Sequence, residues 1–299
     1  MPQRAIVLSL AIVLLLTGAQ RRRAYAPPAN DDASLTFVFD SGFRALNATN
    51  PAPGLDASTG TFYLYYTDHQ NGRQMVQTST DGLSFTAASV AQDWRFDSRN
   101  TLMPDGKTWR RYQLDLRTNT MGSSVSSNGV QFTAESGTRY SPVTQDKSSI
   151  GVYDAFSDRS SGVVLLYIGD LQGVNNVRRA YSRDAGLTFV FDRGNVLGDD
   201  NAGGGANSYV DEKAIRLPDG RIRLFTMKQN TIYSFISADD GYSFTKESGT
   251  RLERSAFGGA TLTSLNDPVV VRLADGRYRM YVASLRSDNT WVIVSATTK

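Results

Sequence analysis

The chain has 299 residues, with 32 Lys and Arg against 29 Asp and Glu, one histidine and no cysteine. The missing cysteines exclude disulfides, thiolate metal sites and a cysteine nucleophile, and a Ser-His-Asp triad would have to use His69, which stands in the polar string TDHQNGR that is typical of a solvated turn. Four of the basic residues lie in the first 26 positions, so the rest of the chain carries 28 basic against 29 acidic side chains and offers no excess positive charge for a nucleic acid.

The first 26 residues predict a secretory signal peptide. Arg4 is followed by the apolar run AIVLSLAIVLLL and the small-residue string TGAQ. The run is shorter than the ~20 apolar residues of a spanning helix, so no stable membrane span is expected. Three arginines, Arg21–Arg23, oppose export of that flank and leave a membrane anchor formed by residues 5–17 as the alternative. Residues 27–299 are predicted to form a single secreted or extracytoplasmic domain.

The chain repeats itself. SLTFVFDSG, from Ser34, recurs nearly unchanged as GLTFVFDRG, from Gly186. A turn string of the type Ser-x-Asp-Gly, flanked by strand-like runs, begins at four positions: Ser79, Ser126, Ser182 and Ser237. A second string, such as LPDGRIRLFTMK, reads as a tight hairpin between two strands. Its glycine recurs at Gly60, Gly106, Gly162, Gly220 and Gly276. Together the two strings predict a four-stranded antiparallel unit of about 55 residues, which describes a propeller blade.

The two turn strings do not occur equally often, and the difference predicts how the ring closes. Five hairpins but only four Ser-x-Asp-Gly turns indicate five blades, the last of which lacks its outer strand because the chain ends at WVIVSATTK. The strand within NDDASLTFVFDSG is predicted to complete that blade. The fold class is therefore an all-β, five-bladed β-propeller, closed by its N-terminal strand so that no open sheet edge remains. No segment has an apolar period of 3.6, so helix should be scarce.

Two of the turn strings, SRDAGLTF and SADDGYSF, resemble the Asp-box, or BNR repeat, of sialidases and many other propellers. The resemblance implies a structural role, in which Ser and Asp hold a turn between the two outer strands of a blade. Sialidases have six blades, three channel arginines and a Tyr–Glu nucleophile pair. Here GFRALN, with Arg44, is only a partial match, so sialidase activity is not predicted.

Acidic residues stand at the start of the inner strand in four of the five units, where the blades of a propeller converge on a central channel. They are Asp97 in WRFDSR, Asp154 in GVYDAF, Asp211 and Glu212 in YVDEKA, and Asp267 in LNDPVV, whereas the first unit has Asn50. Carboxylates held close together raise one another's pKa. A protonated acid beside an ionised one is what glycoside hydrolysis needs. The alternative is structural, because a repeated Asp can also cap the strand by binding backbone amides of the next blade.

Other polar and aromatic residues flank these acids. Arginine and lysine can hold hydroxyls or an acidic sugar, and aromatic rings such as Trp94 and Tyr209 can stack on sugars. The predicted substrate-binding residues are Arg95, Arg99, Tyr153, Asp211, Lys213 and Asn266. No metal-ligand spacing occurs, so no metal or other cofactor is predicted.

The pattern resembles the five-bladed glycoside hydrolases of the arabinanase/β-xylosidase and invertase/levansucrase kinds. In the arabinanase type the first blade supplies an Asp base, the third an Asp that tunes the acid, and the fourth a Glu acid. The resemblance implies that Asp154 is the tuning residue and Glu212 the general acid. The base position falls on Asn50, which leaves Asp97 or Asp267 as the candidate base.

The leading prediction is thus a secreted glycoside hydrolase that acts on glycans or oligosaccharides at the central channel. The alternative is a non-catalytic glycan- or surface-binding propeller, which the Asn at the first unit favours, and a structural scaffold is the third possibility. The sequence carries no signal for the sugar, the linkage or the oligomeric state.

Overall fold

A computed structural model describes residues 36–56, 58–91, 97–129, 131–147, 149–170, 173–201, 208–258 and 261–299. The predicted signal peptide, residues 1–26, lies outside these ranges, as do Trp94 and Arg95. Within them, no helix has the length and apolar character needed to cross a membrane.

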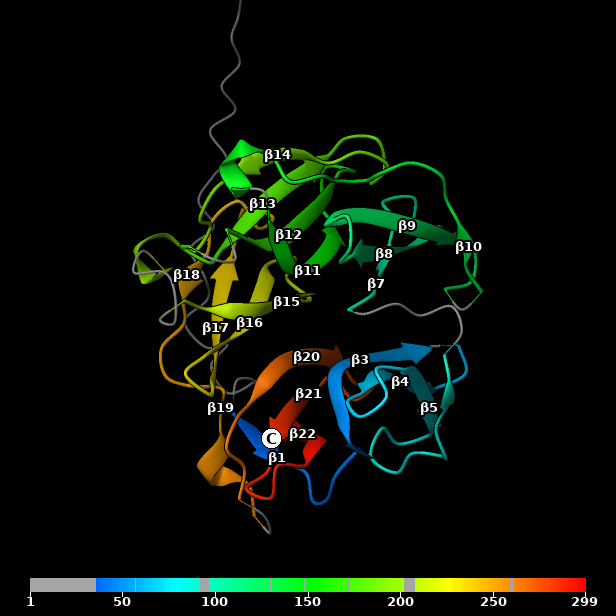
Figure 1. Cartoon of the computed structure of the whole chain (residues 1–299), viewed down its shortest axis with the longest axis vertical. Helices are drawn as coiled ribbons and strands as arrows, with labels where there is room; N and C mark the ends of the chain where they lie inside the picture. Colours follow the sequence, from blue (N-terminus) through cyan, green and yellow to red (C-terminus); the bar gives the residue numbers. More distant parts are fainter. Residues whose placement is uncertain are drawn as a thin grey trace, which may run out of the picture.

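The described strands form five antiparallel sheets around a common axis (Figure 1). Blade 1 contains β3 (Ala48–Asp56), β4 (Thr61–Asp68), β5 (Gln74–Ser79) and β6 (Ser89–Val90). Blade 2 contains β7 (Arg99–Leu102), β8 (Trp109–Asp115), β9 (Thr120–Ser126) and β10 (Thr133–Ala134). Blade 3 contains β11 (Ile150–Ser157), β12 (Val163–Gly169), β13 (Asn176–Ser182) and β14 (Val190–Arg193).

Blade 4 contains β15 (Val210–Arg216), β16 (Ile222–Lys228), β17 (Thr231–Ser237) and β18 (Thr245–Lys246), and β19 (Leu252–Glu253) also pairs with β17. Blade 5 contains β20 (Asn266–Arg272), β21 (Tyr278–Leu285), β22 (Trp291–Thr298) and two N-terminal strands, β1 (Phe37–Phe39) and β2 (Ala45–Leu46). The only helical segments described are short 3-10 turns at Thr144–Asp146, Gly198–Asn201 and Arg254–Ala256. The predicted all-β propeller with little helix is confirmed.

The N-terminal strand closes the ring as predicted. β1 runs antiparallel to the C-terminal β22, with Phe37 opposite Thr298 and Phe39 opposite Ala296. Phe37 is buried and meets Phe225 of blade 4 edge to face, with ring centroids 5.8 Å apart. The side chain of Asp40 accepts hydrogen bonds from Ser295 Oγ at 2.6 Å and Thr297 Oγ1 at 2.9 Å. The first and the last described strands therefore lie side by side in one sheet.

The Ser-x-Asp-Gly strings form the same turn between the third and fourth strands of blades 1 to 4. In blade 3, Ser182 Oγ donates to Asp184 Oδ1 at 2.6 Å and accepts the Gly186 N–H at 2.8 Å. Gly186 has φ +79°, and a Cβ there would lie 1.9 Å from the Tyr112 hydroxyl of blade 2. That hydroxyl donates to the Gly186 carbonyl at 3.1 Å. The turn thus fixes its own loop and also joins two blades.

Ser182→Ala is expected to lower the free energy of unfolding by about 1 to 2 kcal/mol, because the change removes the acceptor of the buried Gly186 amide. The exposed Ser160, in the hairpin turn of the same blade, provides the control Ser160→Ala. Urea unfolding measures both. Equal small losses would show that the turn hydroxyl does not stabilise the fold.

The recurring tails TAESGTR and TKESGTR form a buried ionic network in blades 2 and 4. In blade 4, Glu247 pairs with Arg223 through two bonds of 2.9 and 3.0 Å and accepts the Ser234 hydroxyl at 2.6 Å. Arg251 Nε donates to that hydroxyl at 2.7 Å. The equivalent residues of blade 2 repeat this arrangement: Arg110, Glu135, Ser123 and Arg139. The repeated strings therefore encode how the fourth strand is attached to its blade.

Hydrophobic clusters fill four of the five junctions between neighbouring blades. They lie between blades 2 and 3, blades 3 and 4, blades 4 and 5, and blades 5 and 1. Among the described residues, no such cluster lies between blades 1 and 2. That junction is occupied by a cavity with a volume of about 1410 Å³.

Candidate functional site

A shared backbone feature positions the acids at the start of the inner strands. β3, β15 and β20 each contain a register shift near the start. The shifted residues Asn50, Asp211 and Asp267 have φ of 53°, 59° and 50°, and Asp97, just before β7, has φ of 51°. Asn and Asp adopt this left-handed conformation more readily than most residues. The four side chains therefore stand at equivalent places in blades 1, 4, 5 and 2.

Asp154 is not equivalent to these residues, although its spacing from Asp97 and Asp211 in the sequence is regular. In blade 3 the register shift lies between Ile150 and Tyr153. Asp154 pairs with Leu166 in β12, as Ala214 pairs with Leu224 in blade 4. It therefore lies three residues further along its strand, deeper in the channel, and the alignment that placed it in the same ring is wrong.

The structure brings the strand-start residues together at one end of the channel. The Asp267 amide donates to Asp211 Oδ2 at 3.2 Å, and Asn50 Nδ2 donates to Asp267 Oδ2 at 3.4 Å. Asp97 Oδ1 pairs with Arg99 Nη2 at 2.7 Å, and its Oδ2 lies 3.7 Å from Lys213 Nζ. Residues from four blades thus meet in one polar cluster.

Some of these contacts support the structural alternative, in which an Asp at the start of the inner strand binds backbone amides of the next blade. Asp211 binds the backbone amide of the next blade. Asp154 does the same, accepting the Ala214 amide at 2.7 Å as well as the Ala155 amide at 2.9 Å. Both aspartates therefore help to join neighbouring blades, whatever else they do.

Burial and like charge raise the pKa of several of these acids. Burial is the main cause of the raised pKa of Asp154 and Asp211, and Lys213 opposes it in both. Burial together with the negative charges of Asp211 and Asp97 raises the pKa of Asp267 to about 8. At neutral pH the Asp211–Asp267 pair therefore retains a proton.

Glu212 is fully buried, and neither carboxylate oxygen has a hydrogen-bond partner among the described residues. Burial raises its pKa well above the usual value, and the nearby Lys213 only partly opposes this. Glu212 is consequently held in its neutral form, without contact with solvent.

Glu212→Gln is expected to stabilise the protein increasingly as the pH rises above about 4. The carboxyl has a higher pKa in the folded than in the unfolded chain, so above the unfolded value the unfolded chain releases its proton first. Wild-type stability therefore falls with rising pH until the folded pKa is passed, whereas glutamine does not titrate. Thermal unfolding of both proteins between about pH 4 and pH 8 measures the difference. A difference that does not change with pH would contradict a buried, protonated Glu212.

The predicted sugar-binding residues have varied environments. Tyr153 is fully buried and donates its hydroxyl to the Tyr112 carbonyl at 2.9 Å, so its ring packs in the core. Tyr209 is likewise buried, against Phe235. Arg99 and Lys213 are buried beside Asp97, and Asn266 is partly exposed and donates to Ser264 Oγ at 2.9 Å. The described residues include no group of three or more His, Asp or Glu that could hold a metal ion.

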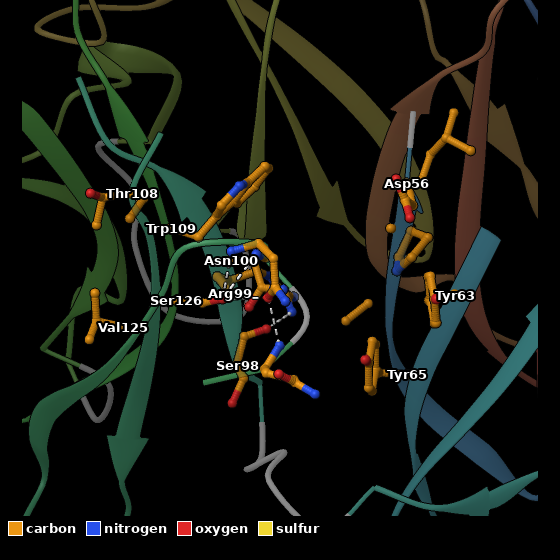
Figure 2. Close-up of a pocket in the computed structure, with 18 of the residues that line it drawn as sticks. Asp56, Tyr63, Tyr65, Ser98, Arg99, Asn100, Thr108, Trp109, Val125 and Ser126 are labelled. Atoms are coloured by element: carbon orange, nitrogen blue, oxygen red, sulfur yellow. Dashed lines mark hydrogen bonds between the residues drawn. The ribbon is translucent and has the colours of Figure 1, made fainter. Parts of the chain in front are cut away.

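Figure 2 shows the cavity between blades 1 and 2, with Arg99 among the residues that line it. Lys213 and Asp154, from the inner strands of blades 4 and 3, also line it, so it reaches the channel. Of the four acids predicted to be catalytic, only Asp154 lines it. Sequence reasoning missed its outer walls, which include Tyr63, Tyr65, Asn100 and Trp109. The available signal was the alternating run TFYLYYTD, which places Tyr63 and Tyr65 on the same face of a strand.

No protein-family model matches the chain, and no curated protein matches it by sequence. Several solved glycoside hydrolases are similar in structure. The catalytic domain of a family 62 α-L-arabinofuranosidase from Coprinopsis cinerea aligns with a TM-score of 0.63 and 13% identity, over 89% of this chain and 98% of that chain. An α-L-arabinofuranosidase from Podospora anserina, solved in complex with cellotriose, has a TM-score of 0.60 and 13% identity over 89% and 97%.

An endo-arabinase from Bacteroides thetaiotaomicron has a TM-score of 0.58 and 15% identity over 87% of this chain and 96% of that chain. At these identities the likeness is one of fold. The chain has the five-bladed β-propeller architecture found in glycoside hydrolases, as its resemblance to the arabinanase type predicts.

Proposed function

We propose that this protein is a glycoside hydrolase whose reaction centre lies at the end of the channel where the inner strands start. The observation that carries the proposal is the meeting of Asp211 and Asp267, two partly exposed residues from blades 4 and 5: the Asp267 amide donates to Asp211 Oδ2, and the charge of Asp211 contributes to the raised pKa of Asp267. The fold shared with known glycoside hydrolases supports it.

The roles of the acids follow from their exposure. Asp97, Asp154 and Glu212 are buried, whereas Asp211 and Asp267 are partly exposed. We assign the proton donor to Asp267 rather than to Glu212, because Asp267 retains a proton at neutral pH and lies within reach of solvent. It would protonate the oxygen of the leaving group, while Asp211, once ionised, would activate water or attack the sugar carbon. Asp97 would hold Arg99 and Lys213 in place behind this pair.

Glycan binding without turnover is the second candidate function. It is favoured by Asn50, which stands where the arabinanase type has its base and donates a hydrogen bond to Asp267 instead. An amide cannot accept the proton of an attacking water.

The experiment that tests the proposal incubates the purified protein with arabinan, arabinoxylan, xylan and their oligosaccharides, which follow from the arabinofuranosidases, endo-arabinase and xylanase of similar fold. Chromatography of the products is expected to show new reducing ends from at least one of them. Saturable binding without products would favour the second candidate function. Neither binding nor products would contradict both. Export is part of the proposal, because residues 1–26 are predicted to be a secretory signal peptide. It is tested by recovering the protein from outside the cytoplasm and determining its N-terminal sequence.

A further inference from the structure

The lining of the cleft between blades 1 and 2 extends from Arg99 and Lys213, beside Asp97, to the hairpin turns at the opposite end of the inner strands. Its rim includes hairpin-turn residues of the two blades, such as Ser58 and Gly106. The other four blade junctions are filled by hydrophobic clusters, whereas this one holds a volume of about 1410 Å³. We propose that this cleft is a second glycan site, which binds a neutral oligosaccharide between the two blades.

The wall formed by blade 1 presents a row of aromatic rings. The strand β4 alternates, so Phe62, Leu64 and Tyr66 are buried while Tyr63 and Tyr65 are partly exposed and line the cleft. Their rings are parallel to within 16°, with centroids 6.4 Å apart. Figure 2 shows both tyrosines on the cavity side of their strand. Rings arranged in this way can stack against successive sugars of a chain.

The wall formed by blade 2 faces them with Trp109 and Asn100 (Figure 2). The indole of Trp109 lies against Gly129 in the adjacent turn, where a Cβ would come within 3.2 Å of the ring. Because residue 129 is a glycine, the backbone of the turn can pack directly against the indole. Asn100 is exposed, and its Oδ1 accepts a hydrogen bond from Arg111 Nε at 2.9 Å. This bond, within the same wall, fixes the orientation of the Asn100 amide group. Aromatic and amide groups on facing walls suit the apolar faces and the hydroxyls of sugars.

The inner end of the cleft provides hydrogen-bond donors. Arg99 is 7% exposed and lines the cleft, and its Nε has no hydrogen-bond partner among the described residues. Lys213 also lines this end and donates to the Tyr153 carbonyl at 2.9 Å.

The charges and the size of the cleft define the class of ligand. Arg99 is neutralised by Asp97, and at the rim the exposed Lys107 is matched by the exposed side of Asp56. Balanced charge favours a neutral glycan over an acidic one. The volume of about 1410 Å³ exceeds that of sites for single small molecules, so an oligosaccharide rather than a monosaccharide is expected. The inference takes only its carbohydrate class from the proposed function and does not require turnover.

The test uses calorimetric titration of the full chain with xylohexaose, arabinohexaose and cellohexaose, each also measured on the Asp267→Asn variant to prevent turnover. We expect at least one of these to bind, and Tyr63→Ala and Trp109→Ala each to weaken binding by about tenfold. Tyr63→Phe should retain the affinity. Tyr242→Ala, which removes an exposed ring in blade 4, is the matched control and should leave binding unchanged.

Binding that is lost in Asp267→Asn but unaffected by the cleft variants would place the glycan at the channel and overturn the inference. Absence of binding by all three hexasaccharides, or binding of oligogalacturonate in their place, would overturn it as well. If Trp109→Ala fails to fold, Tyr63→Ala against Tyr63→Phe decides the matter, because both changes are at a partly exposed position. Cleft binding without any hydrolysis would contradict the proposed function and leave this inference intact.

Discussion

Replacing Asp267 by asparagine is expected to lower the kcat for glycoside hydrolysis by about 100- to 10,000-fold, the range typical of a lost general acid. The side chain keeps its shape and the backbone amide keeps its bond to Asp211, but the side chain can no longer give a proton to the leaving oxygen. The KM should change little because no binding group is removed. Initial rates on the substrate that the wild type cleaves measure both constants.

The pH dependence separates this role from a structural one. Burial and neighbouring charge raise the pKa of Asp267, so the wild-type rate should fall as the pH rises through about 8, and the residual rate of Asp267→Asn should lack this limb. Asp275→Asn, at the exposed hairpin turn of the same blade, is the control and should keep full activity. An unchanged kcat in Asp267→Asn would refute the assignment of the donor.

Replacing Phe37 by alanine is expected to lower the free energy of unfolding by about 3 to 5 kcal/mol. Phe37 is 8% exposed, belongs to the cluster between blades 4 and 5, and meets Phe225 edge to face. Its loss leaves a cavity where β1 joins the sheet of β22, and it should lower the Tm by about 2 to 4 °C per kcal/mol.

The neighbouring Val38 supplies the control. It lies in the same strand but is 47% exposed, so Val38→Ala should cost well under about 1 kcal/mol. Chemical denaturation measures both variants. If the two lose equally little, the N-terminal strand does not hold the ring together in the way described.

The repeats made the fold predictable. The five hairpin glycines and four Ser-x-Asp-Gly turns correspond to the turns between the observed strands, and the extra strand at the N-terminus pairs with β22. The strings that recur in several blades form contacts that stabilise each blade, such as the hydrogen-bonded network of Glu247 and the turn at Ser182. Because the same turn strings occur in several blades of one chain, the strand order of a blade could be predicted from this sequence alone.

The site was less predictable because it depends on differences between blades. Equal spacing placed Asp154 in register with Asp97 and Asp211, but Asp154 stands three residues beyond the register shift of β11, whereas Asp211 and Asp267 stand at the shifts of their own strands. The sequence also marked Glu212 as exceptional without revealing that burial removes both of its oxygens from solvent. Among the described residues, the cleft lies where no hydrophobic cluster joins blades 1 and 2. The alternation in TFYLYYTD places Tyr63 and Tyr65 on one face of a strand, but it does not indicate that this face borders a cleft.

The protonation state of Asp267 is the most direct test of the proposed reaction centre, and its measurement needs no substrate. In carbon-13 NMR of the carboxyl groups, the resonance that Asp267→Asn removes identifies this side chain. We predict that it keeps the chemical shift of a protonated acid at pH 7 and titrates near pH 8. A resonance that titrates near pH 4, as in an ordinary exposed aspartate, would contradict the account.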